Sequence, residues 1–393
     1  MNVSLLNTEI QAFINSNINA DISSLVLKGS PFPNVTIQEL IAQIEAKKRC
    51  EKKLPTWFNT PNIYYPNKLN IEQTSSEITA KFKANLLNGN SIIDLTGGFG
   101  VDCFYFSKVF KTVIHCEINT ALSTIVKHNF KQLPANVETV TANGIEHLNT
   151  IKKPLDWIYI DPSRRHDSKG KVFFLNDCLP NVPKHLDLLF SKANNILIKT
   201  SPLLDITVGL NELKAVKKIF IVAVNNEVKE LLWELEKGFS GKIEIHTCNI
   251  KKESEQHFKF YLETENHSED ATTSFPLNYV YEPNVAILKS GAFNTIAQQL
   301  HLFKLHKHTH LYTSTKVQEF PGRRFKVENI LPYNKKTLKK AGFKQANITT
   351  RNFPETVSQI RKKHHIKDGG DCYLFFCTDL ENNKIVLQTK KLA

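Results

Sequence analysis

The stretch that decides the fold reads IIDLTGGFG and spans residues 92–100. Its apolar start is typical of a buried strand, which ends at the carboxylate of Asp94 and continues into a turn with Gly97, Gly98 and Gly100. Glycines let the backbone turn sharply and let a ligand approach without a Cβ in the way. A helical pattern follows, so we predict a strand, a ligand-binding glycine turn and a helix; a tight turn without a ligand is the alternative.

Outward from this turn, short β-rich runs alternate with helical patterns as far as residue 263. We predict strands at residues 91–95, 112–117, 137–141, 156–161, 195–199, 218–224, 242–247 and 257–263. Helices are expected between them, for example at 121–130 and 228–237. Strands separated by helices indicate βαβ units and a mostly parallel sheet, whose ligand-binding loops share one edge. The predicted fold class is therefore α/β, with a Rossmann-like sheet.

Three strand ends carry groups suited to an adenosyl ligand. Glu117 closes the second predicted strand, where a carboxylate can accept both hydroxyls of a ribose. The glycine turn lacks Gly-x-Gly-x-x-Gly spacing and a following Gly-Lys-Ser/Thr, and Asp94 would repel a pyrophosphate but suits an ammonium group. These features favour S-adenosylmethionine over NAD. Asn143, after the third strand, is placed to hydrogen-bond the adenine, although Asn-Gly is also an ordinary turn.

A fourth strand end, at Asp161, is followed by Pro162, Ser163, Arg164 and Arg165. Asp161 can accept the proton or the hydrogen bond of an attacking group, and the two arginines offer forked donors for phosphate or carboxylate. We predict Asp161 as the catalytic residue and Arg164 and Arg165 as substrate-binding residues. A surface cluster of salt bridges is the alternative.

The positive charge of the chain lies near its end. Among 393 residues, 51 are Lys or Arg and 38 are Asp or Glu, and residues 301–393 hold 19 of these bases against 7 of the acids. Four bases line one face of a helix predicted over residues 335–341: Lys335, Lys336, Lys339 and Lys340. This asymmetry indicates a module that binds a polyanion, while a solubilising tail is the alternative.

The composition is that of an ordinary globular protein, with 41% hydrophobic and 23% charged residues. No apolar run approaches the roughly 18–20 residues of a spanning helix and the N-terminal stretch is no signal peptide, so we expect no membrane contact. Seven cysteines without a Cys-x-x-Cys pair favour a cytoplasmic protein. His306, His308 and His310 alternate, but no cysteine or clear carboxylate joins them, and we predict no metal.

Changes of pattern divide the chain into four predicted parts. They are an N-terminal helical region at 1–85, the α/β domain at 86–265, a small unit at 275–318 and a small, basic α+β domain at 319–393. In the last part we expect a strand at 325–330 and a hairpin of 372–377 with 384–389.

The chain resembles a bacterial family that joins a class I S-adenosylmethionine-dependent methyltransferase domain to a ferredoxin-like segment and a C-terminal THUMP-like domain. The motifs that carry the likeness are EQTSSE at 72–77, DLTGGFG at 94–100, DPSRR at 161–165, YEPN at 281–284, LPYNKK at 331–336 and GGD at 369–371. The likeness implies that Asp94 and the glycines border the methionine moiety, that Glu117 binds the ribose and that Asn143 lies by the adenine. THUMP domains are associated with RNA, so the likeness also implies phosphate contacts from the four helix lysines and from Arg351, Arg361, Lys362 and Lys363.

The DPSRR motif resembles the Asp/Asn-Pro-Pro-aromatic motif of amino-methylating enzymes, with Ser163 and Arg164 as departures. Arg164 also makes it similar to the Asp-Pro-Pro-Arg motif of 5-methylpyrimidine enzymes, which need a nucleophilic cysteine after the next strand. Residues 198–202 read IKTSP, without a cysteine. We therefore predict direct methyl transfer with no covalent intermediate.

These patterns predict an S-adenosylmethionine-dependent methyltransferase that acts on structured RNA, tRNA or rRNA, with the basic domain as its dock. One alternative is a catalytically silent RNA-binding or assembly protein that retains the cofactor fold. Another is a methyltransferase of proteins or small molecules. The residues favour no particular oligomeric state.

Overall fold

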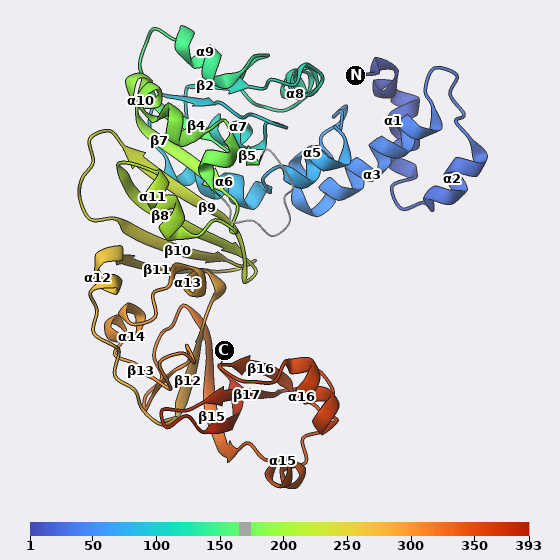
Figure 1. The fold of residues 1–393 in the computed structure, drawn as a ribbon. Coiled ribbons are helices and arrows are strands. Elements are labelled where there is room, and N and C mark those ends of the chain that lie inside the picture. The colour runs from blue at the N-terminus through green and yellow to red at the C-terminus, as the bar shows by residue number, and fades with distance from the viewer. Residues whose placement is uncertain (165–173, 393) are drawn as a thin grey trace. The chain divides into compact units, whose positions relative to one another are not determined.

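The computed structural model describes residues 1–164 and 174–392, and these form two compact units (Figure 1). The first unit holds Met1–Val216 and Leu232–Ser240, and the second holds Lys217–Leu231 and the chain from Gly241 onward. Within the described ranges, no helix has both the length and the apolar character needed to cross a membrane.

The chain before the first strand is mainly helical. Its elements are η1 (Val3–Leu6), α1 (Thr8–Ser16), α2 (Ile22–Lys28), α3 (Ile37–Lys53), α4 (Pro55–Asn59), α5 (Lys68–Gln73) and α6 (Glu77–Leu86). Helix α3 begins at a capping box, in which Thr36 accepts the Glu39 N–H and the Glu39 carboxylate accepts the Thr36 N–H. Buried Trp57 of α4 packs against Phe104, with 5.0 Å between ring centroids. The helical region is therefore packed onto the helix that follows the glycine turn.

The large sheet has the strand order β11-β10-β8-β9-β7-β4-β1-β2-β3. Its strands are β1 (Ser91–Asp94), β2 (Thr112–Cys116), β3 (Glu138–Val140), β4 (Leu155–Ile160), β7 (Ala193–Thr200), β8 (Val216–Val224), β9 (Glu227–Glu236), β10 (Glu244–Ile250) and β11 (Glu255–Tyr261). From β7 to β3 neighbouring strands are parallel, and Ile93 of β1 lies between Ile114 and Ile158 in a buried register. The predicted α/β fold with a Rossmann-like sheet is confirmed, and the ends of β1, β2, β3 and β4 share one edge.

Helices connect these strands, in keeping with a parallel sheet. They are α7 (Val101–Phe106), α8 (Thr120–Gln132), α9 (Gly144–Thr150), α10 (Val182–Lys192) and α11 (Ile206–Glu212). Between β4 and α10 lie β5 (Ser163–Arg164), η2 (Leu175–Asp177) and β6 (Cys178–Leu179), and β5 pairs antiparallel with β6.

The helix predicted at residues 228–237 is wrong, because residues 228–236 lie in strand β9. The stretch is rich in Leu, Glu and Lys, which are good helix formers. Residues 231–235 are all buried, Glu234 included, because β9 lies inside the sheet between β7 and β8. A strand covered on both faces shows no alternation of polar and apolar residues, and burial overrides its propensity. Asn225 and Asn226 join β8 to β9, both at positive φ, as tight hairpin turns require.

The second unit carries a seven-stranded sheet in the order β13-β14-β12-β15-β18-β17-β16. Its strands are β12 (Tyr279–Pro283), β13 (Phe303–Lys304), β14 (Tyr312–Ser314), β15 (Gly322–Pro332), β16 (Asn347–Arg351), β17 (Cys372–Thr378) and β18 (Lys384–Lys391). Its helices are α12 (Leu262–Asn266), α13 (Val285–Ser290), α14 (Thr295–Gln299), α15 (Lys335–Ala341) and α16 (Val357–His364). The predicted strand lies within β15, the predicted helix is α15, and β17 with β18 is the predicted hairpin.

Helix α11 approaches β9 through Gly209, where a Cβ would lie 2.3 Å from the Trp233 ring. We expect Gly209→Ala to lower the free energy of unfolding by about 1–3 kcal/mol, because the added methyl overpacks a buried contact. Urea unfolding followed by tryptophan fluorescence measures the change, with exposed Asn211→Ala of the same helix as control. Equal midpoints for the two variants would contradict this packing.

Candidate cofactor and substrate site

The turn after β1 needs its glycines for separate reasons. A Cβ at Gly97 would lie 2.3 Å from the ring of His115, and one at Gly100 would lie 2.7 Å from the Phe130 ring. Gly98 adopts φ +53°, and among the described residues other than its chain neighbours, a Cβ there would come within 4 Å of the Thr96 carbonyl oxygen alone, at 3.8 Å. The turn is thus packed tightly at Gly97 and Gly100, while the described residues leave space around Gly98.

Glu117 follows β2 and is bonded to the glycine turn. Its Oε2 accepts the Gly98 N–H at 2.9 Å, and its Oε1 accepts the Asn119 N–H at 2.7 Å. These bonds hold the carboxylate beside the open surface of the turn and leave further lone pairs for hydroxyl donors. The next residue, Ile118, is 68% exposed.

Asp94 lies at the end of β1 and is only 2% exposed. Its Oδ1 accepts bonds from the Thr96 N–H at 2.9 Å and from the Thr96 hydroxyl at 3.2 Å. Burial, together with nearby Asp102 and Asp161, raises the pKa of Asp94 to about 7. The carboxylate therefore braces the turn from below, and its predicted contact with an ammonium group stays a prediction.

Asn143 caps helix α9, where its Oδ1 accepts the N–H groups of Ile145 at 3.0 Å and Glu146 at 3.4 Å. A Cβ at Gly144 would lie 2.2 Å from the Leu95 carbonyl oxygen, so this helix start is packed against the end of β1. With its oxygen used as the cap, Asn143 would offer a ligand its amide N–H donors. Its position by the adenine stays a prediction.

Asp161 follows β4 and is tied to the glycine turn through Thr96, whose hydroxyl oxygen accepts the Asp161 N–H at 2.7 Å. Its carboxylate forms an ion pair through Oδ2 with Lys199 on the neighbouring strand β7. Lys199 was not predicted from the sequence, because a lysine near a strand end resembles any surface lysine. Arg164 lies in β5, and Arg165 lies outside the described residues.

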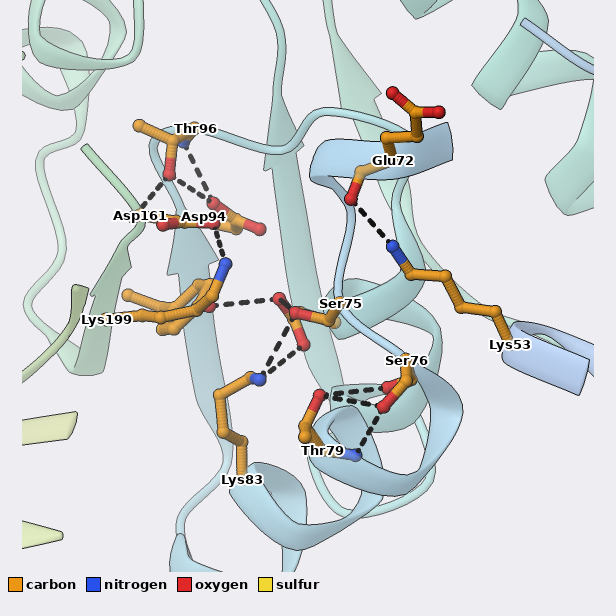
Figure 2. A network of polar contacts seen from close by, with 12 residues as sticks. Lys53, Glu72, Ser75, Ser76, Thr79, Lys83, Asp94, Thr96, Asp161 and Lys199 are labelled. Atoms are coloured by element: carbon orange, nitrogen blue, oxygen red, sulfur yellow. Dashed lines mark hydrogen bonds and ion pairs between the residues drawn. The ribbon is translucent and has the colours of Figure 1, made fainter. Parts of the chain in front are cut away.

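A buried polar network is centred on Asp102 of α7, and Figure 2 labels two of its members, Ser75 and Lys83. Lys83 of α6 is fully buried and lies 3.2 Å from Asp102 Oδ1, while Asp102 Oδ2 accepts the hydroxyls of Ser75 at 2.8 Å and Tyr159 at 2.9 Å. Burial opposes ionisation, but Lys83 and Lys199, with these hydroxyls, lower the pKa of Asp102. The EQTSSE motif thus reaches the site through Ser75.

The four predicted lysines of α15 are exposed to solvent, while buried Leu338 anchors the helix. Three other predicted phosphate contacts are engaged in ion pairs: Arg351 with Glu282 at 3.0 Å, Arg361 with Asp368, and Lys363 with Glu355 at 2.8 Å. In the described part of the chain, the α15 lysines therefore offer the more accessible charge.

The histidine run forms no strand, and His306 instead bonds to Asn382 at 3.1 Å. Among the described residues, Cys248, Glu255 and His257 have possible ligand atoms within 4.8 Å of one another. Burial raises the pKa of the Cys248 thiol to about 12, which disfavours the thiolate that a metal would need.

The raised pKa of Asp94 predicts a pH-dependent difference between the parent and Asp94→Asn. The folded parent binds a proton below about pH 7, whereas the unfolded chain does so near the ordinary aspartate pKa of 3.8. The stabilisation of the folded state by protonation of Asp94 is therefore complete below about pH 4 and is lost as the pH rises through about 7. Between pH 8 and pH 5 we expect the parent to gain about 2–3 kcal/mol over the variant in urea unfolding. Parallel pH curves would contradict this.

Two family models match the end of the chain, a ferredoxin-like domain at residues 279–321 and a THUMP domain-like model at residues 322–391. A comparison with curated proteins finds no match. Two partial likenesses are a putative methyltransferase from Escherichia coli and the tRNA m1G37 methyltransferase from M. jannaschii. They cover 41% and 42% of this chain and 84% and 50% of their own, at 18% and 12% identity, with TM-scores of 0.31 and 0.29.

A full-length likeness is found to the crystal structure of a putative methyltransferase from Porphyromonas gingivalis W83. It covers 100% of both chains at 32% identity, with a TM-score of 0.91. At that identity over the whole length, and with the two domain matches at its end, the chain belongs to the family of this Porphyromonas gingivalis protein, in which a methyltransferase-type α/β fold is joined to ferredoxin-like and THUMP-like domains.

Proposed function

We propose that this protein is a cytosolic S-adenosylmethionine-dependent methyltransferase that modifies structured RNA, tRNA or rRNA. The observation that carries the proposal is the bond between Glu117 Oε2 and the Gly98 N–H, which holds a carboxylate beside the open glycine turn. Membership of the family of a putative methyltransferase supports the activity. Seven cysteines without a disulfide support the cytosol.

The residues of the turn fit such a cofactor. Gly98 leaves the space above the turn open, Glu117 has lone pairs for the ribose hydroxyls, and Ile118 adds an apolar surface beside them. When bound, S-adenosylmethionine supplies an electrophilic methyl group. Asp161 would then accept a hydrogen bond from the attacking group, and holding that group in line would contribute most of the rate.

The α15 lysines support RNA as the substrate, since they are exposed in a THUMP-like domain. Lysines on one helix face contact phosphates, which provides affinity and position with little reading of sequence. Lys335, Lys336, Lys339 and Lys340 are therefore the proposed RNA dock.

We expect Glu117→Ala to weaken binding of S-adenosylhomocysteine at least about tenfold, because two charge-assisted hydrogen bonds to the ribose are lost. Isothermal titration measures the dissociation constant, and Glu138→Ala, an exposed acid on β3, is the matched control. Equal affinities of the Glu117 variant and the parent for S-adenosylhomocysteine would contradict the cofactor assignment.

We expect the fourfold Lys→Gln variant of the α15 lysines to bind tRNA more weakly and with a shallower salt dependence. Losing four phosphate contacts should reduce the slope of log K against log salt by about 3. A control with the same charge change replaces four exposed lysines of the first unit, Lys127, Lys131, Lys152 and Lys153. Identical slopes for the two variants would argue that these bases only solubilise the protein.

Mass-spectrometric comparison of nucleosides in RNA from parent and deletion cells tests the activity itself. We expect one methylated nucleoside to be missing after deletion and to return when purified protein and S-adenosylmethionine are added. Binding of RNA without any lost nucleoside would favour the silent RNA-binding protein, and methyl transfer to protein extracts alone would favour a protein methyltransferase.

A further inference from the structure

The ion pair between Asp161 and Lys199 lies at the edge of the sheet where the proposed methyl transfer would take place. Ile160 of β4 is in register with Ile198 of β7, so the two residues that follow, Asp161 and Lys199, are side by side. Figure 2 shows both beside Asp94 and Thr96. The side chain of Asp161 is 33% exposed, whereas that of Lys199 is 13% exposed. The carboxylate side chain is therefore more exposed to solvent than the lysine that pairs with it.

Two groups of Asp161 are held by the protein, its backbone N–H and one of its carboxylate oxygens. Its N–H donates to the Thr96 hydroxyl oxygen at 2.7 Å, and its Oδ2 pairs with Lys199. Among the residues that the structure describes, Oδ1 has no hydrogen-bond partner, so it remains an acceptor on the exposed side. An incoming N–H or O–H group would meet an acceptor whose position is already set.

Lys199 also neutralises charge that the site would otherwise accumulate. Asp102 and Asp161 both lie close enough to Asp94 to affect it electrostatically, and Lys83 is already paired with Asp102. Without Lys199, the carboxylate of Asp161 would have no paired cation and would attract any cation that approached it. With Lys199 in place, Asp161 can act as a hydrogen-bond acceptor without trapping the positively charged cofactor.

We propose that Lys199 is a positioning residue that fixes Asp161 so that its Oδ1 accepts the proton of the substrate nucleophile. This inference rests on the proposed function and deepens it, because it commits the site to an O–H or N–H nucleophile of RNA. The bond from that oxygen or nitrogen to the methyl carbon forms while the carbon–sulfur bond breaks and sulfur keeps the electron pair. The proton passes to Asp161 Oδ1 and leaves to water at the exposed side.

The test compares two ligands and does not depend on turnover. S-Adenosylhomocysteine carries no group in the place of the transferred methyl, whereas sinefungin carries an ammonium there. We expect Lys199→Gln to raise the preference for sinefungin over S-adenosylhomocysteine about tenfold in isothermal titration, because Asp161 then lacks its internal cation. Lys199→Arg and Lys214→Gln, an exposed lysine of the same unit, should keep the parent ratio. Asp161→Asn should lower the ratio below that of the parent.

The outcomes separate the two proposals. If the parent binds neither ligand, the cofactor assignment fails and this inference fails with it. If the parent binds both and the ratio is the same in all variants, Asp161 does not face the transferred group and only this inference is overturned. If Lys199→Gln does not fold, Asp161→Asn, a substitution at a partly exposed position, still tests whether Asp161 faces the transferred group.

Kinetics with RNA that the parent methylates give a second readout. We expect Lys199→Gln to lower kcat at least about 100-fold with little change in KM, and Lys199→Arg to restore part of it. A change confined to KM would contradict a positioning role.

Discussion

The turn after β1 can form only because side chains are absent at two of its positions. Gly97 leaves room for the ring of His115, and Gly100 leaves room for Phe130. Burial lowers the pKa of His115 to about 4, so the ring is neutral when it bonds through Nε2 to the Gly98 carbonyl oxygen at 3.2 Å. The His115 bond holds the carbonyl group of Gly98, while the Glu117 carboxylate accepts the Gly98 N–H. The conformation of the glycine turn therefore depends on a packed, neutral histidine next to it.

A second constraint is the balance of charge at the same edge. Three carboxylates, Asp94, Asp102 and Asp161, lie close together, and unpaired buried charges are costly. The protein meets this cost with Lys83 and Lys199, and with a raised pKa that lets Asp94 accept a proton. Because Lys83 comes from α6, the N-terminal helical region is part of the site's electrostatics as well as its packing.

The candidate site residues that could be predicted from the sequence are those that stand in a local sequence pattern. The glycine turn, Glu117 and Asp161 stand in one continuous pattern of strand, polar end and helix, which the order of residues along the chain displays. Lys199 has no such local signal, since its ion pair with Asp161 results from the pairing of β4 with β7. Residues 228–237 show the opposite situation, because their composition favours a helix but nearly all of them form a strand inside the sheet.

The amino-acid sequence by itself determined the alternation of strands and helices, the glycine turn and the position of the basic α15 face, because these follow from periodicity, backbone freedom and composition. Only the tertiary structure decided that Asp94 is buried, that Ser75 and Lys83 reach Asp102, and that Lys199 pairs with Asp161. The physical reason is that burial and charge pairing arise between strands and helices that are distant along the chain. These contacts determine which groups are exposed, ionised or already hydrogen-bonded, and no local sequence pattern encodes them.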